Sequence, residues 1–140
     1  MITLVLAALL AAGDLWHKAS TPTPPWAYHD RSTAWVALSL ALLGAVVALA
    51  RVPSIAVAIT AGILAGGVLG NLVSGLLHSL AVPDPIVVAT GRGVAAFNLA
   101  DVFVLTGILS LTVALVAAVI RHRDSLRPPR AWERPLRRRS

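Results

Sequence analysis

Four long apolar stretches constrain the fold of this 140-residue chain more than any other feature. They run from about Ile2 to Trp16, Ala34 to Ala50, Ser54 to Leu80 and Phe97 to Ile120. A helix needs about 20 apolar residues to cross the hydrocarbon core of a bilayer, and charged residues make up only 13% of this chain. The sequence therefore predicts an all-α membrane protein with four transmembrane helices, and it leaves no room beside them for a soluble catalytic domain.

The first stretch has two interpretations. Its apolar residues end at Gly13 and Asp14, which also fits the apolar region of a signal peptide with Ala11-Ala12-Gly13 as the cleavage site. However, no basic residue precedes Lys18, and a signal peptide begins with a basic segment. A helix that continues through Trp16 to Lys18 is long enough to cross the membrane, with the lysine amine reaching the interface.

The excess positive charge is confined to the C-terminal end. From Arg121 onward eight arginines face only Asp124 and Glu133, whereas basic and acidic residues balance before Arg121. Basic segments beside a membrane helix stay in the cytoplasm. Both termini and the tight Arg51-Val52-Pro53 turn are therefore predicted to be cytoplasmic, in a multi-pass protein of the plasma membrane. We expect residues 1–120 to form the transmembrane domain, and residues 121–140 a disordered tail that touches membrane lipids and not nucleic acid.

Two connections then face the outer side of the membrane. The first, from Lys18 to Thr33, is short and rich in proline. The second carries two β-prone runs, Ile86 to Ala89 and Val94 to Phe97, on either side of Gly91-Arg92-Gly93, which favours a turn. This pattern predicts a small β-hairpin on the outer side.

Small residues recur at every fourth position of the third apolar stretch, at Gly62, Gly66, Gly70 and Ser74. Residues four apart lie on one face of a helix. A face of this kind allows the backbones of two membrane helices to approach closely. We therefore expect the third span to pack tightly against a neighbouring helix along this seam.

Polar side chains collect toward the outer ends of the predicted spans. Such groups are costly inside a membrane and require a partner or a function. Asp14 and Lys18 lie four residues apart, which is the geometry of an ion pair within a helix. The full set is Asp14, Lys18, Asn71, His78, Asp84, Asn98 and Asp101. Their expected convergence is the main functional signal in the sequence.

Asp84 and Asp101 are the candidate catalytic residues. Asp84 lies between two prolines and cannot sit inside a helix. The predicted hairpin leaves from Asp84 and returns toward Asp101, so the two backbones are held close. Two carboxylates in a partly desolvated site share one proton. One can then take a proton from an attacking water while the other protonates the departing amine. Asn71 and Asn98 would hold the substrate backbone or the carboxylates in register.

Several motifs resemble those of the lipoprotein signal peptidases (signal peptidase II), a family of four-helix membrane aspartyl peptidases. Residues 66–72, GGVLGNL, look like the family's GGAxGNL segment, and residues 97–101, FNLAD, match its FNxAD motif. Residues 14–18, DLWHK, are similar to its DQxxK, and residues 29–35, HDRSTAW, are similar to its HNxGAAF. The resemblance covers nearly the whole chain up to Ile120.

The resemblance implies a dyad of Asp84 and Asp101, because Asp84 falls where the family has its VxDF aspartate. It also implies a substrate, the signal peptide of a diacylglyceryl-modified prolipoprotein, cut on the amino side of the lipidated cysteine. This chain departs from the family in three places. Ser74 and Gly75 replace an Asp-Arg pair, Pro85 replaces a phenylalanine, and the first outer loop is much shorter.

These departures leave two alternatives to a peptidase open. One is a family relative that binds lipidated substrates or a membrane partner without cutting them. The other is a small proton-coupled transporter subunit, in which Asp101 would be a lone protonation site. None of the three needs a metal or another cofactor. The four histidines lack the spacing of an HExxH metal site, and a cysteine-based site is excluded because the chain has no cysteine.

Overall fold

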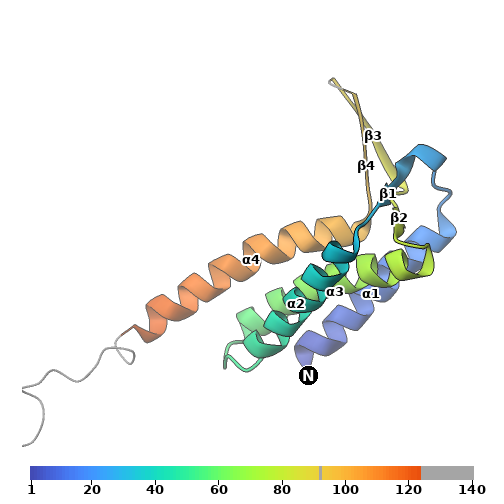
Figure 1. The fold of residues 1–140 in the computed structure, drawn as a ribbon. Helices are drawn as coiled ribbons and strands as arrows, with labels where there is room; N and C mark the ends of the chain where they lie inside the picture. The colour runs from blue at the N-terminus through green and yellow to red at the C-terminus, as the bar shows by residue number, and fades with distance from the viewer. Residues whose placement is uncertain (92, 124–140) are drawn as a thin grey trace, which may run out of the picture.

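A computed structural model describes residues 1–91 and 93–123 of the chain. These residues form four α-helices and two small antiparallel ribbons. Figure 1 shows the ribbons gathered at one end of the helices, which we call the ribbon end. The helices are α1 (Ile2–Ser20), α2 (Thr33–Leu49), α3 (Ile55–Leu77) and α4 (Leu99–His122), and a 3₁₀ turn, η1, covers Pro25–Ala27. The strands are β1 (Tyr28–Asp30), β2 (Ala81–Pro83), β3 (Ile86–Thr90) and β4 (Gly93–Phe97).

Helix α3 lies at the centre and packs against the other three helices. The predicted seam of small residues faces α1. A Cβ atom added at Gly66 would lie 2.7 Å from Cβ of Leu10, which is too close for any side chain. A neighbouring face of α3 is just as close to α4, since a Cβ at Gly67 would lie 2.5 Å from the carbonyl oxygen of Ala100. The glycines thus let α3 touch two helices at backbone distance.

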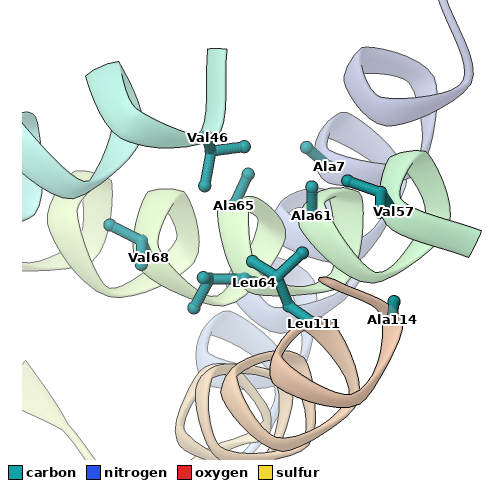
Figure 2. Close-up of a cluster of buried hydrophobic side chains, with 9 residues drawn as sticks. All are labelled: Ala7, Val46, Val57, Ala61, Leu64, Ala65, Val68, Leu111 and Ala114. Atoms are coloured by element: carbon teal, nitrogen blue, oxygen red, sulfur yellow. The ribbon is translucent and has the colours of Figure 1, made fainter. Parts of the chain in front are cut away.

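All four helices contribute to the buried apolar core, which follows α3 (Figure 2). Its members are Ala7, Val46, Val57, Ala61, Leu64, Ala65, Val68, Leu111 and Ala114. Most are small, which agrees with an assembly held by close packing. In contrast, long apolar side chains on α4 face outward, and Leu109 and Val113 are more than half exposed. Lipid chains would cover these side chains in a membrane.

Three helices, α1, α3 and α4, are long and apolar enough to cross a membrane, and the structure is that of a multi-pass membrane protein. Helix α2 is shorter. Its 17 residues span about 25 Å at the usual rise, because Ser32 caps its start and the turn before Pro53 ends it. The four-span prediction therefore holds for three helices, and the crossing by α2 remains a prediction.

The predicted β-hairpin is present as β3 and β4, which pair in register from Ile86 with Phe97 to Thr90 with Gly93. A second ribbon was not predicted. Strand β1, in the proline-rich connection, pairs antiparallel with β2, which directly precedes Asp84. The short first connection is therefore an ordered part of the ribbon end and not only a link between helices.

Helices α3 and α4 differ slightly from the predicted spans at the ribbon end. Helix α3 ends at Leu77 and not at Leu80, because Ser79 and Leu80 adopt left-handed backbone angles (φ 54° and 71°) that turn the chain into β2. Helix α4 begins at Leu99, two residues after the predicted start, because Asn98 is its N-cap. Its other end reaches His122, inside the predicted 121–140 tail, and residues 124–140 lie outside the described part of the chain.

Candidate active site

An ion pair from α1 forms one end of a buried polar network. Asp14 and Lys18 are both buried, and the Lys18 Nζ lies 2.7 Å from Oδ2 of Asp14. The other oxygen of Asp14 accepts a hydrogen bond of 2.8 Å from the backbone N–H of Ala100, in the first turn of α4. A helix N-terminus has free N–H groups that suit a carboxylate. The pair therefore ties α1 to the start of α4.

Asn71 of α3 extends this network to Asp101. Its side-chain oxygen accepts a bond of 2.9 Å from the Lys18 Nζ, and its Nδ2 donates a bond of 2.8 Å to Oδ1 of Asp101. Asp101 also forms a capping box with Asn98: the backbone N–H of Asp101 donates to Asn98 Oδ1 at 2.9 Å, and that of Asn98 donates to Asp101 Oδ2 at 3.2 Å. Both carboxylate oxygens of Asp101 therefore accept N–H donors.

Asp84 lies on the other side of Asn98 and is 2% exposed. One of its oxygens accepts a hydrogen bond from Nδ2 of Asn98, which is fully buried, and the other is bonded to Nδ1 of His29 on β1. Its backbone N–H donates to the carbonyl of Ala27 at 2.9 Å, which continues the β1–β2 pairing. The Asp84 side chain is thus fixed from two directions.

The two candidate catalytic carboxylates are neighbours without sharing a hydrogen bond. Within residues 1–91 and 93–123, no hydrogen bond joins the carboxylate of Asp84 to that of Asp101. Asn98 lies between the two aspartates and forms hydrogen bonds with both. Burial raises the pKa of Asp84, and the nearby charge of Asp101 raises it as well. Hydrogen bonds from His29 and Asn98 act in the opposite direction. On balance the pKa of Asp84 is raised, so this carboxyl keeps a proton more readily than an exposed aspartate.

A groove of about 190 Å³ lies beside this network. Arg31, which precedes α2, lines it, and its guanidinium lies over the ring of Trp35 at 5.5 Å from the ring centre. The Nε of Arg31 is buried without a hydrogen-bond partner among the described residues. The residues that line the groove are Arg31, Trp35, Leu38, Ser39, Leu42, Val68, Asn71, Asp101 and Val104. The groove is thus mainly apolar, with a carboxylate and an amide on one wall and a cation on another.

The structure brings all six predicted site residues into one network: Asp14, Lys18, Asn71, Asp84, Asn98 and Asp101. His78 lies apart from it, with Nδ1 bonded to the carbonyl of Ser74. The sequence reasoning assigned no role to His29 or Arg31. The positions of both side chains depend on the pairing of β1 with β2. This pairing was not predicted, because the connection that contains β1 is rich in proline. In the described part of the chain, no group of three or more His, Cys, Asp or Glu side chains could hold a metal ion.

Comparisons with known proteins identify a family and a similar fold. A family model described as signal peptidase (SPase) II matches residues 23–117, which is more than half of the chain. A solved structure, described as a bacterial membrane enzyme studied by the in meso method, has a similar fold, with a TM-score of 0.61 and 16% sequence identity. The similarity covers 89% of this chain and 91% of that one. No curated protein matches this chain.

Proposed function

Since this chain belongs to the signal peptidase II family, we propose that it is a membrane aspartyl endopeptidase that removes signal peptides from diacylglyceryl-modified prolipoproteins. One observation carries the proposal. Asp101 lines the groove, and it is joined through Asn98 to a second, buried carboxylate that keeps a proton readily. A base that faces a substrate groove and an acid beside it are the two groups that amide hydrolysis by water requires.

The surroundings of the two carboxylates support different roles for them. Asp101 accepts two N–H donors and lines the groove, so it acts as the carboxylate that takes a proton from the attacking water. Asp84 supplies the proton that the departing amine needs. The Asp84 oxygen nearest Asn98 already accepts a hydrogen bond from the Asn98 side-chain amide. The substrate must therefore displace this amide, or take the proton through a bridging water.

The groove suits an extended peptide that leaves a membrane helix. Its apolar wall, from α2 and α4, suits the aliphatic side chains of a signal peptide, and the outward apolar side chains of α4 suit acyl chains. Arg31 has unused donor capacity at the groove. We propose that the guanidinium of Arg31 donates hydrogen bonds to the carbonyl oxygens of the bound peptide.

We further propose that the first helix is retained and that the ribbon end faces the outer side of the plasma membrane, with both termini cytoplasmic. The network supports the retention of α1, because Asp14 and Lys18 are part of it. Orientation is testable because the chain has no cysteine. In intact cells a membrane-impermeant maleimide should label Val88→Cys, in the hairpin, and not Arg51→Cys. The reverse labelling would overturn the orientation.

The activity is tested with purified full-length protein and a diacylated prolipoprotein peptide that carries a fluorescence-quencher pair across the cleavage site. Wild type should cut this peptide, and Asp84→Asn and Asp101→Asn should each lower kcat by about 10²- to 10⁴-fold, the usual contribution of general acid or base catalysis. Asp30→Asn, an exposed aspartate of β1 that forms no side-chain hydrogen bond among the described residues, is the matched control.

Each other outcome points to another function. Peptide binding without cleavage by wild type would favour the non-cutting relative, for which the replacement of the family's Asp-Arg pair by Ser74 and Gly75 is the motivation. Cleavage that survives either Asp→Asn substitution would remove the dyad. Neither binding nor cleavage, together with proton uptake into proteoliposomes that depends on Asp101, would favour the transporter.

A further inference from the structure

His29 is brought to Asp84 by the ribbon that the sequence analysis did not predict. Strands β1 and β2 pair antiparallel with His29 opposite Val82 and Tyr28 opposite Pro83. The backbone bond from Asp84 to Ala27 continues this pairing by one step. The imidazole therefore reaches Asp84 from a strand that is fixed on the same sheet, and its Nδ1 bonds the Asp84 carboxylate.

The two partners differ sharply in their exposure. The His29 side chain is 52% exposed, whereas the Asp84 side chain is 2% exposed. Among the described residues, Nδ1 is the only nitrogen of the His29 ring with a hydrogen-bond partner, so Nε2 is free to exchange a proton with water. An imidazole can accept a proton at one nitrogen and release one from the other. His29 thus connects a buried acid to solvent.

The other charges around this pair come from three elements. Asp101 of α4 lies on the far side of Asn98, Lys18 of α1 is close enough to act on Asp84 through space, and Asp30 follows His29 on β1. Lys18 is already paired with Asp14. Among these groups, only His29 forms a hydrogen bond with the Asp84 carboxylate.

The proposed reaction needs such a connection. In each turnover Asp101 gains a proton from water, and Asp84 loses one to the departing amine. The two carboxylates are separated by Asn98 and share no hydrogen bond, so the proton on Asp101 has no direct path back to Asp84. Asp101 can release its proton to water in the groove that it lines. Asp84, being buried, must recover one through a neighbour.

We propose that His29 is a positioning residue for the peptidase reaction of the preceding section, and that it returns the proton to Asp84 after each turnover. Nε2 takes a proton from solvent, the proton on Nδ1 moves to the Asp84 carboxylate, and the ring is left neutral with its proton on Nε2. Before the next turnover the half-exposed ring releases the Nε2 proton to solvent and takes one at Nδ1, which restores the starting tautomer. One proton enters the pair from solvent for each proton that Asp84 gives to the amine. The same hydrogen bond fixes the Asp84 side chain in position.

Substitution of His29 tests both parts. Removal of the bond from His29 raises the pKa of Asp84 further. Because Asp84 acts in its protonated form, activity is lost as pH rises through that pKa. In His29→Ala the alkaline limb of kcat/KM should therefore move to higher pH, and kcat should fall about tenfold. Free imidazole should restore kcat.

His29→Asn separates positioning from proton transfer. The asparagine amide can still donate to Asp84 from the place of Nδ1, but it cannot pass a proton. It should keep the wild-type KM with a low kcat that imidazole does not raise. His78→Asn, whose histidine bonds only a backbone carbonyl, is the matched control with unchanged kinetics. A wild-type pH profile in His29→Ala would overturn the proposal, and full kcat in His29→Asn would overturn the proton transfer.

The ¹³Cγ resonance of Asp84 gives a second measurement that does not depend on activity. It is assigned by its loss in Asp84→Asn, and its midpoint should move to higher pH in His29→Ala. If wild type cuts no peptide while this midpoint still moves, the proposed function fails and the His29–Asp84 pair stands. If wild type cuts and the midpoint is unchanged, the pair fails and the function stands.

Discussion

Substitution of Asn98 should be among the most damaging changes to this site, because one fully buried side chain performs two tasks. It caps α4 by accepting from the backbone N–H of Asp101, and it donates to the buried Asp84 carboxylate. Loss of an N-cap costs about 1 kcal/mol, and a buried carboxylate oxygen left without its donor costs about 1–3 kcal/mol. In Asn98→Ala the free energy of unfolding should therefore fall by about 2–4 kcal/mol.

Asn98→Ser separates these two contributions, since serine is a good N-cap but is too short to reach Asp84. It should lower the free energy of unfolding by about 1–3 kcal/mol, so the alanine variant should be less stable than the serine variant by about 1 kcal/mol. Reversible unfolding in mixed micelles measures both values. Equal losses in the two variants would contradict the capping role. A loss below about 0.5 kcal/mol in Asn98→Ser would contradict the bond to Asp84.

Three other substitutions should have distinct effects. Asp84→Asn should lower kcat by about 10²- to 10⁴-fold. It should also flatten the dependence of stability on pH above 3.8. The raised pKa of Asp84 means that the folded wild type binds more protons than the unfolded chain, so the free energy of unfolding falls as pH rises toward that pKa. Gly67→Ala should lower the free energy of unfolding by about 2 kcal/mol or more, because its Cβ would lie 2.5 Å from a backbone oxygen of α4. Arg31→Gln should raise KM for the lipidated peptide about tenfold with little change in kcat.

Gly67→Ala and Arg31→Gln each have a control variant, and Gly67→Ala and Asp84→Asn each have a contradicting result. Gly44→Ala, at a glycine of α2 with no atom near its added Cβ, should be neutral or stabilising by up to about 1 kcal/mol. An equal loss at both glycines would contradict the close packing of α3 on α4. Arg51→Gln, at the far end of α2, should leave KM unchanged. If the free energy of unfolding of Asp84→Asn still depends on pH as it does in wild type, a group other than Asp84 causes that dependence.

The residues that form the network could be named from the sequence, and the way in which they connect could not. Each of the six is a polar group that a membrane helix or its edge would not carry without a reason. Their separation along the chain, from Asp14 to Asp101, hid which group bonds which. Among the described residues the Asp84 and Asp101 carboxylates form no direct hydrogen bond with each other, and Asn98 bonds both residues, so the proton shared by the pair stays a prediction.

Local and periodic features were determined by the sequence alone. Short-range rules predict features that depend on neighbours within a few positions of the chain. These features are the apolar stretches of helical length, the small residues at every fourth position of α3, the hairpin turn and the pairing of Asp14 with Lys18. Helix α2 follows the same rules, because Thr33–Leu49 agrees within one residue at each end with the apolar stretch from Ala34 to Ala50.

Only the tertiary structure decided that β1 pairs with β2, and hence that His29 meets Asp84 and that Arg31 lines the groove. The two strands lie more than 50 residues apart in the chain, so their pairing depends on how the helices pack and bring them together. No local pattern in Tyr28–Asp30 specifies this pairing. The composition thus determined a lipid-embedded bundle with costly polar groups, while the packing of α3 determined which of those groups could act together.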